Sequence, residues 1–94
     1  MFDIRHNESG HIKLSGRFDA SRADEVRNFL DTVTESCTLD FKDLEYISSA
    51  GLGVLLGKQK RLSESSHSLK IINLNKHIKE IFIVAGFDLV FDIE

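Results

Sequence analysis

The apolar residues of this chain change their spacing several times, and that alternation limits the fold to an α/β domain. Near the N-terminus, apolar and polar residues alternate at positions 2–5 and 11–15, as in half-buried strands, and the polar stretch 7–10 between them predicts a hairpin turn. After Gly16 the spacing becomes three and four, which predicts a helix with one apolar face: Ala23, Val26, Leu30 and Val33. Ser21 and Asp24 resemble a capping box at its start.

The same alternation continues to the C-terminus. Strands are predicted at residues 37–41, 69–74 and 89–91, and a helix is predicted at about 50–65. Asn75 is a suitable N-cap for a third helix, Gly86 is a natural stop, and its apolar stripe consists of Ile78, Ile81, Phe82 and Ala85. Right-handed helical crossovers between successive strands favour parallel pairing. We therefore expect a single α/β domain over residues 1–94 in the order ββαβαβαβ, with a mixed sheet (N-terminal hairpin plus parallel strands) and helices packed on one face.

The charge, hydropathy and cysteine content of the chain argue against several classes of function. A formal net charge of −3 without a long Lys/Arg run argues against nucleic acid as the main partner. The apolar runs are far shorter than a membrane span, and the first residues lack the pattern of a signal peptide. Cys37, the one cysteine, has no partner for an internal disulfide, so the cytoplasm is the expected compartment. We expect no cofactor and no metal, because metal-ligand spacing is lacking among the four histidines: His6, His11, His67 and His77.

Two adjacent hydroxyl residues, Ser48 and Ser49, lie where the strand at 37–41 gives way to the helix at 50–65. Ser is a favoured N-cap, because its oxygen accepts a hydrogen bond from a free N–H group of the first turn. The same place carries the positive end of the helix dipole, which stabilises an attached anion. The pattern therefore fits either a plain helix cap or a phosphorylation site.

The helix at 50–65 has two contrasting sides on a helical wheel. The predicted core face consists of Leu52, Leu55, Leu56, Gln59 and Leu62. The opposite side carries Ala50, Gly53, Val54, Gly57 and Arg61, with Lys58 beside them. Because a glycine inside a helix costs about 0.5–1 kcal/mol relative to alanine, we interpret this side as a partner-binding surface. The alternative is that the glycines let the helix lie close to the sheet. The basic residues Lys58, Lys60 and Arg61 fit partner binding or simple complementarity to the helix dipole.

The glycines do not complete an enzyme motif. Gly51 and Gly57 are one residue too far apart for a P-loop, and Leu56 stands where a dinucleotide fingerprint needs Gly or Ala. Ile47 replaces the first glycine of a hydrolase elbow around Ser49. No acid/base pair or nucleophile–base pair is evident, so an enzyme is not expected.

Two segments resemble the STAS domain of bacterial anti-sigma factor antagonists: Gly16 to Asp19, and Leu39 to Leu56 with its Ser-Ser-Ala-Gly-Leu-Gly core. The family motif reads Asp-Ser-[Ser/Thr]-Gly-Leu-Gly, so the resemblance places the phosphoacceptor on Ser49 and less readily on Ser48. In this chain Ser48 replaces the Asp and Ala50 replaces the following hydroxyl residue. The resemblance also places Asp19 near the acceptor and Asp40 at a polar position at the end of the central strand.

The resemblance implies a partner-switching regulator. Its unphosphorylated form would bind an ATP-using anti-sigma factor kinase and release a sigma factor, and a metal-dependent serine phosphatase would reverse the modification. The alternative is a non-switching STAS subunit of a cytoplasmic complex, such as a lipid-transport ABC system. Neither alternative involves direct nucleic-acid binding or membrane insertion.

Overall fold

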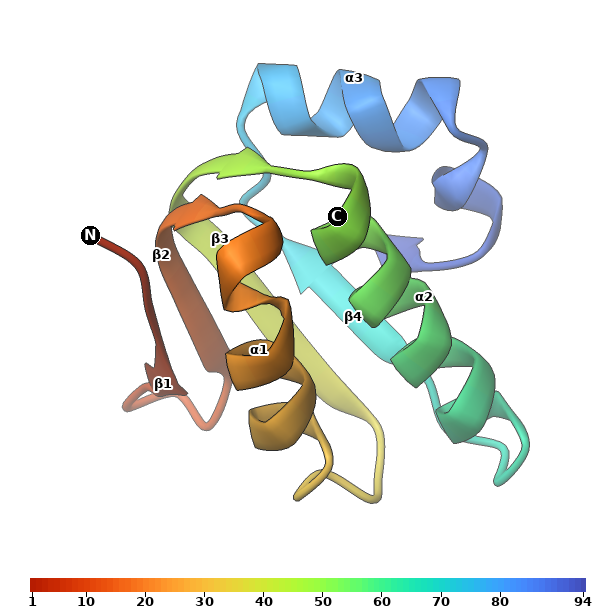
Figure 1. The fold of residues 1–94 in the computed structure, drawn as a ribbon. Helices are drawn as coiled ribbons and strands as arrows, with labels where there is room; N and C mark the ends of the chain where they lie inside the picture. The colour runs from red at the N-terminus through yellow and green to blue at the C-terminus, as the bar shows by residue number, and fades with distance from the viewer.

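A five-stranded sheet organises the computed structural model, which describes residues 1–94 (Figure 1). The strands lie in the sheet in sequence order: β1 (Asp3–His6), β2 (Ile12–Phe18), β3 (Cys37–Ile47), β4 (Leu69–Ile72) and β5 (Asp92–Ile93). β1 pairs antiparallel with β2, and every later pair is parallel. The predicted mixed sheet, an N-terminal hairpin followed by parallel strands, is confirmed.

The helices build the second layer of the fold. They are α1 (Ala23–Leu30), α2 (Ser49–Ser63) and α3 (Lys76–Val84), with short 3-10 turns η1 (Ala20–Arg22) and η2 (Phe87–Leu89). α1 and α2 lie side by side across one face of the sheet, and α3 crosses one end of it (Figure 1). Between the layers lies the core, whose most fully buried residues include Leu14, Phe18, Val26, Leu30, Leu39, Phe41, Leu55, Leu69, Ile71, Ile78 and Phe82.

The predicted caps of α3 are confirmed. Asn75 Oδ1 accepts a hydrogen bond from the Ile78 N–H at 2.8 Å, and Gly86 follows the helix with a left-handed φ of 77°. Of the predicted apolar stripe, Ile78 and Phe82 are buried, whereas Ile81 is half-buried and Ala85 is exposed. The capping box predicted for α1 is wrong. Ser21 does not cap that helix, because its own N–H donates to the Asp19 carboxylate in the turn that precedes it.

Most strand bounds differ from the prediction: β2 continues past residue 15 to Phe18, β4 ends at Ile72 rather than at residue 74, and β3 and the last strand differ most. β3 does not end at Phe41 but runs to Ile47, because Leu44 and Ile47 are buried and shifts of register against β2 accommodate the charged residues between them. The strand predicted at 89–91 is wrong. Phe87 begins the turn η2 instead, and the Phe87 and Phe91 rings each lie within 6 Å of the Phe82 ring centroid, at 5.9 and 5.8 Å. With these rings packed together, the last strand begins only at Asp92 and ends at Ile93.

The orientation of α2 about its axis also differs from the prediction. Leu55 and Leu62 are buried as expected, but Leu52 is only half-buried and Leu56 is 37% exposed. Val54 and Lys58, predicted to face outward, are buried at 7% and 8% exposure. The reason is that α2 packs against α1 as well as the sheet, so a wider part of its surface is covered. Ala50, Gly53, Gly57 and Arg61 are exposed as predicted.

Candidate functional site

Ser48 connects the end of β3 to the start of α2. Its backbone is extended, with φ −86° and ψ 169°, and its Oγ accepts a hydrogen bond from the Gly51 N–H at 3.1 Å. Its own N–H donates to the Phe18 carbonyl at 2.9 Å, which joins the ends of β2 and β3. Ser48 is therefore the N-cap of α2. Asp and Ser are about equally good N-caps, so the serine keeps the local function that an Asp would serve there.

Ser49 is the first residue of α2 and has a different environment. Its side chain is exposed, and its hydroxyl makes no hydrogen bond within the chain. The first N–H groups of a helix have no intrahelical acceptor, and the first turn of α2 contains no acidic residue. A negatively charged group at this position would therefore meet the positive end of the helix dipole.

Asp19 lies at the same end of the sheet as these two serines. The register pairs Phe18 of β2 with Ile47 of β3, so the residues that follow each strand are neighbours. The Asp19 carboxylate accepts hydrogen bonds from the Ser21 hydroxyl and the Ser21 N–H, and the Ser21 hydroxyl is the main reason that its pKa is lowered. The structure thus places Asp19 and Ser48 directly after two paired strand ends, and Ser49 follows as the first residue of α2. A role of Asp19 beside the acceptor stays a prediction.

Asp40 does not join them. Because β3 continues to Ile47, Asp40 lies inside the strand rather than at its end. Its carboxylate accepts hydrogen bonds from the Lys42 N–H at 2.9 Å and from Asn73 Nδ2 at 3.0 Å. Asn73 has a left-handed φ of 61°, so Asp40 supports the turn after β4 and is corrected from a near-site residue to a structural one.

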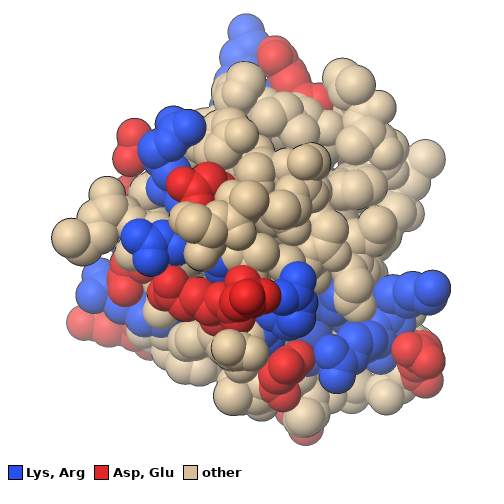
Figure 2. All heavy atoms as spheres, in the orientation of Figure 1, with Lys and Arg blue, Asp and Glu red and all other residues tan.

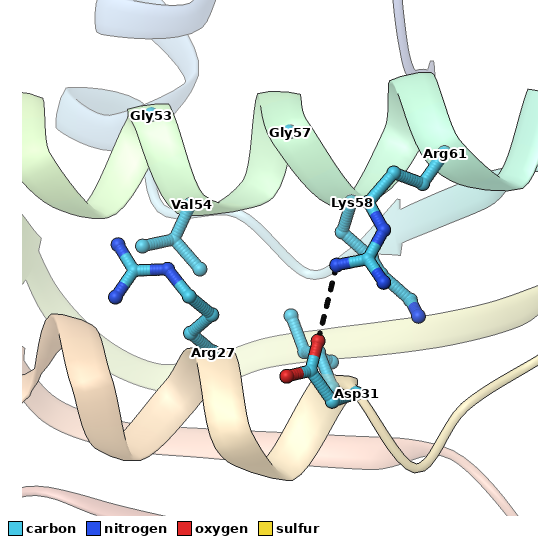
Figure 3. A pocket seen from close by; sticks show the side chains of 8 residues that line it. Arg27, Asp31, Gly53, Val54, Gly57, Lys58 and Arg61 are labelled. Atoms are coloured by element: carbon cyan, nitrogen blue, oxygen red, sulfur yellow. Dashed lines mark hydrogen bonds and ion pairs between the residues drawn. The ribbon is translucent and has the colours of Figure 1, made fainter.

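A pocket of about 120 Å³ lies between α1 and α2 (Figure 3). Five of the seven predicted partner-binding residues line it from α2: Gly53, Val54, Gly57, Lys58 and Arg61. The opposite wall is formed by two residues of α1 and by its C-cap: Arg27, Leu30 and Asp31. Sequence analysis missed this wall, because nothing in the pattern of α1 by itself indicates that these side chains face another helix.

Ion pairs and hydrogen bonds connect the two walls of the α1–α2 pocket. An Arg61 guanidinium nitrogen lies 3.2 Å from the Asp31 carboxylate (Figure 3), and Lys58 Nζ donates to the Val33 carbonyl after α1. Arg27 pairs with Asp24 on its own helix. Lys58 is thus a buried link between two elements, in addition to lining the pocket.

The three glycines of α2 divide into two kinds. A Cβ on Gly51 would lie 3.0 Å from Ile47 Cγ1 and 3.2 Å from the Phe18 ring, so Gly51 permits close packing of the helix on the sheet. A Cβ on Gly53 or Gly57 would meet nothing within 4 Å. The close-packing alternative is therefore wrong for Gly53 and Gly57, the pair for which it was stated, and Gly51 is instead the glycine of α2 that lies close to the sheet.

Other kinds of site find no support in the side-chain arrangement. No group of three or more His, Cys, Asp or Glu side chains is placed to hold a metal ion. Cys37, at the start of β3, is half-buried, and burial raises the pKa of its thiol. None of the helices is both long enough and apolar enough to cross a membrane.

Comparisons with known proteins agree with this geometry. The family described as "Mlab, STAS domain" matches residues 2–92. The anti-sigma-B factor antagonist of Bacillus subtilis is 30% identical over 97% of this chain and 87% of its own length. The phosphorylated form of the Bacillus cell fate determinant SpoIIAA has a similar fold, with a TM-score of 0.72 at 16% identity over 100% of this chain and 91% of that chain. An anti-sigma factor antagonist from Mycobacterium paratuberculosis gives a TM-score of 0.80 at 15% identity, over 99% of this chain and 83% of that one.

The fold and the residues around Ser49 define a STAS domain, and the chain belongs to the family of the bacterial anti-sigma factor antagonists. The relatives named above are regulatory proteins, antagonists of anti-sigma factors and a cell fate determinant.

Proposed function

We propose that this protein is a partner-switching regulator controlled by phosphorylation of Ser49. Its unphosphorylated form binds a kinase-type anti-sigma factor and relieves the inhibition of a sigma factor. The kinase uses ATP to modify Ser49, and a serine phosphatase restores the binding form. The observation that carries this proposal is the contrast between the two serines: Ser48 is committed to the N-cap, whereas Ser49 presents an exposed, unbonded hydroxyl.

A phosphate on Ser49 is compatible with the fold. It adds about −1.5 to −2 charges at a helix N-terminus, where the dipole and the free N–H groups stabilise an anion. SpoIIAA, which shares the fold, has been solved in both the phosphorylated and the unphosphorylated form. We therefore expect the domain to remain folded after modification, so the switch acts on binding rather than on stability.

The surface beside Ser49 supports this mechanism. Figure 2 shows an area without charged side chains over the N-terminal part of α2 and the C-terminal half of α3. α2, α3, η2 and the C-cap of η2 also carry exposed apolar residues: Leu56, Ile83, Val84, Leu89 and Val90. A partner that covers this area would have to desolvate the phosphate at its edge. A penalty of about 3 kcal/mol lowers affinity on the order of a hundredfold.

The experiment uses each anti-sigma factor kinase encoded in the same genome as this protein. After incubation with the cognate kinase and ATP, peptide mass spectrometry should place one phosphate on Ser49. Ser49→Ala should remain bound to the kinase and Ser49→Asp should bind weakly. Ser48→Ala is the matched control, because it removes the neighbouring hydroxyl and should still be phosphorylated on Ser49. Phosphate on Ser48, or none with any of these kinases, would contradict the proposal.

Binding should also depend on the outer glycines of α2. Gly53→Arg and Gly57→Arg should abolish binding of the anti-sigma factor, because each places a long side chain on the surface predicted to contact it. Since a Cβ at either position meets nothing within 4 Å, the far-UV circular dichroism should not change. Loss of the fold in these variants would show that the glycines serve internal packing.

A second candidate is a non-switching STAS subunit of a cytoplasmic complex, such as a lipid-transport ABC system. It is favoured by the two departures from the switching motif, Ser48 for Asp and Ala50 for a hydroxyl residue. The neighbouring genes separate the two candidates, since transporter subunits would favour this one and a kinase with a phosphatase would favour the switch.

A further inference from the structure

The α1–α2 pocket is small, basic and open at the surface. Its cationic residues are Arg27, Lys58 and Arg61, and Asp31 is the only carboxylate that lines it. The whole chain has a formal net charge of −3, so this pocket has a local charge opposite to that of the molecule. Figure 2 shows basic side chains gathered over the C-terminal half of α2.

The size of the pocket limits what it holds. Its volume of about 120 Å³ is well below that of pockets for drug-sized ligands, which measure about 300–1,000 Å³. A nucleotide or a similar cofactor is therefore too large. The head of one side chain fits, and among the possible side chains the charges favour a carboxylate, because an apolar group would desolvate the cations without pairing them.

The rim of the pocket leaves room for the backbone that carries the carboxylate. Gly53 and Gly57 are four residues apart on the outer side of α2, and the space above each is empty to at least 4 Å from a built Cβ. Two exposed glycines one helical turn apart let another backbone approach closely. In Figure 3 the Arg27 and Arg61 side chains extend from the two helices into the space between them, below these glycines.

The existing ion pairs do not block the pocket. Arg61 is 65% exposed and its partner Asp31 is 48% exposed, and Arg27 pairs with Asp24, which is 91% exposed. Pairs with this much exposure contribute little to stability, so both guanidinium groups are available to a stronger acceptor. Lys58 is held by the Val33 carbonyl and adds a fixed positive charge at the base.

We propose that the α1–α2 pocket binds an acidic side chain of the anti-sigma factor, with Arg27 and Arg61 as its ion-pair partners. This inference rests on the proposed function, since it assigns a second contact to the same partner. Ser49 is not among the residues that line the pocket, so the contact is separate from the phosphorylated hydroxyl.

The test measures the dissociation constant of the complex with the purified anti-sigma factor by isothermal titration calorimetry. Arg27→Glu and Arg61→Glu should each weaken binding about tenfold or more, because truncating or reversing one partner of a buried charge pair is costly. Arg5→Glu is the matched control: it makes the same charge change on β1, where Arg5 pairs only with Asp3, and should alter affinity less than about twofold. Raising the NaCl concentration should weaken the complex of the unaltered protein more than that of Arg27→Glu.

Folding is checked separately by circular dichroism and thermal unfolding. Arg27→Gln is a second variant at this position. It removes the positive charge but, unlike Arg27→Glu, does not place a second carboxylate beside Asp24. If the unaltered protein binds and the Arg27 and Arg61 variants bind with the same affinity, this inference is overturned and the proposed function is left intact. No binding of the unaltered protein would overturn the proposed function itself. Saturable binding of inorganic phosphate in the pocket, with no effect of the variants on the complex, would identify a small-anion site instead.

Discussion

The outer glycines of α2 allow a direct test of the helix orientation described above. Gly57 lies inside the helix, is exposed, and would place a new Cβ in open space. Glycine at such a position costs about 0.5–1 kcal/mol relative to alanine, because it loses more backbone freedom on folding. We therefore expect Gly57→Ala to increase the free energy of unfolding by about 0.5–1 kcal/mol, and Gly53→Ala to do the same.

The opposite result is expected at Gly51. The new Cβ would lie 3.0 Å from Ile47 Cγ1 and 3.2 Å from the Phe18 ring, and both neighbours are almost fully buried. Overpacking of this kind costs about 1–3 kcal/mol, which outweighs or cancels the helix-propensity gain of about 1 kcal/mol. Gly51→Ala should thus be no more stable than the unaltered protein, and less stable than Gly57→Ala by about 1–3 kcal/mol.

Urea and thermal denaturation followed by circular dichroism measure these differences. For a domain of this size, the expected gain at Gly57 raises Tm by about 2–8 °C. Destabilisation by both Gly53→Ala and Gly57→Ala would refute the argument, because it would mean that the outer glycines contact the rest of the chain. The α1–α2 pocket and the partner surface built on them would then be lost as well.

Three further predictions address the core, the helix cap and the site carboxylate. Leu55→Ala should cost about 2–5 kcal/mol of unfolding free energy, since Leu55 is fully buried, and a cost below about 1 kcal/mol would contradict the packing of α2. Ser48→Ala should cost about 0.5–2 kcal/mol in urea unfolding while Ser48→Asp should cost little, because only the first removes the N-cap acceptor. NMR titration should find the pKa of Asp19 below the usual carboxyl range and raised in Ser21→Ala. Because the pKa of Asp19 is lower in the folded protein, its ionised carboxylate stabilises the fold above the unfolded pKa, and this contribution is lost as the pH falls through the folded pKa. Ser21→Ala should lose less stability over that pH range.

Local signals were sufficient for the order of the elements and for the central motif. Asn75 and Gly86 were identified as the ends of α3, because a cap and a stop act on backbone groups within a few residues. The Ser48–Ser49 pair was placed at the start of α2 for the same reason. Such features depend on chain neighbours alone, so the amino-acid sequence by itself determines them.

The features that sequence analysis missed depend on neighbours that are distant in the chain. The spacing within α2 indicates which residues share a side, but α1 covers a second side and buries Val54 and Lys58 there. β3 continues past Phe41 because register shifts against β2 let Leu44 and Ile47 reach the core. The α1 wall of the pocket exists only once the two helices lie side by side. The amino-acid sequence therefore determined the order of the elements up to α3 and the position of Ser49 at the start of α2. Only the tertiary structure decided which side of α2 remained exposed, because burial is set by contacts between segments rather than by periodicity within one.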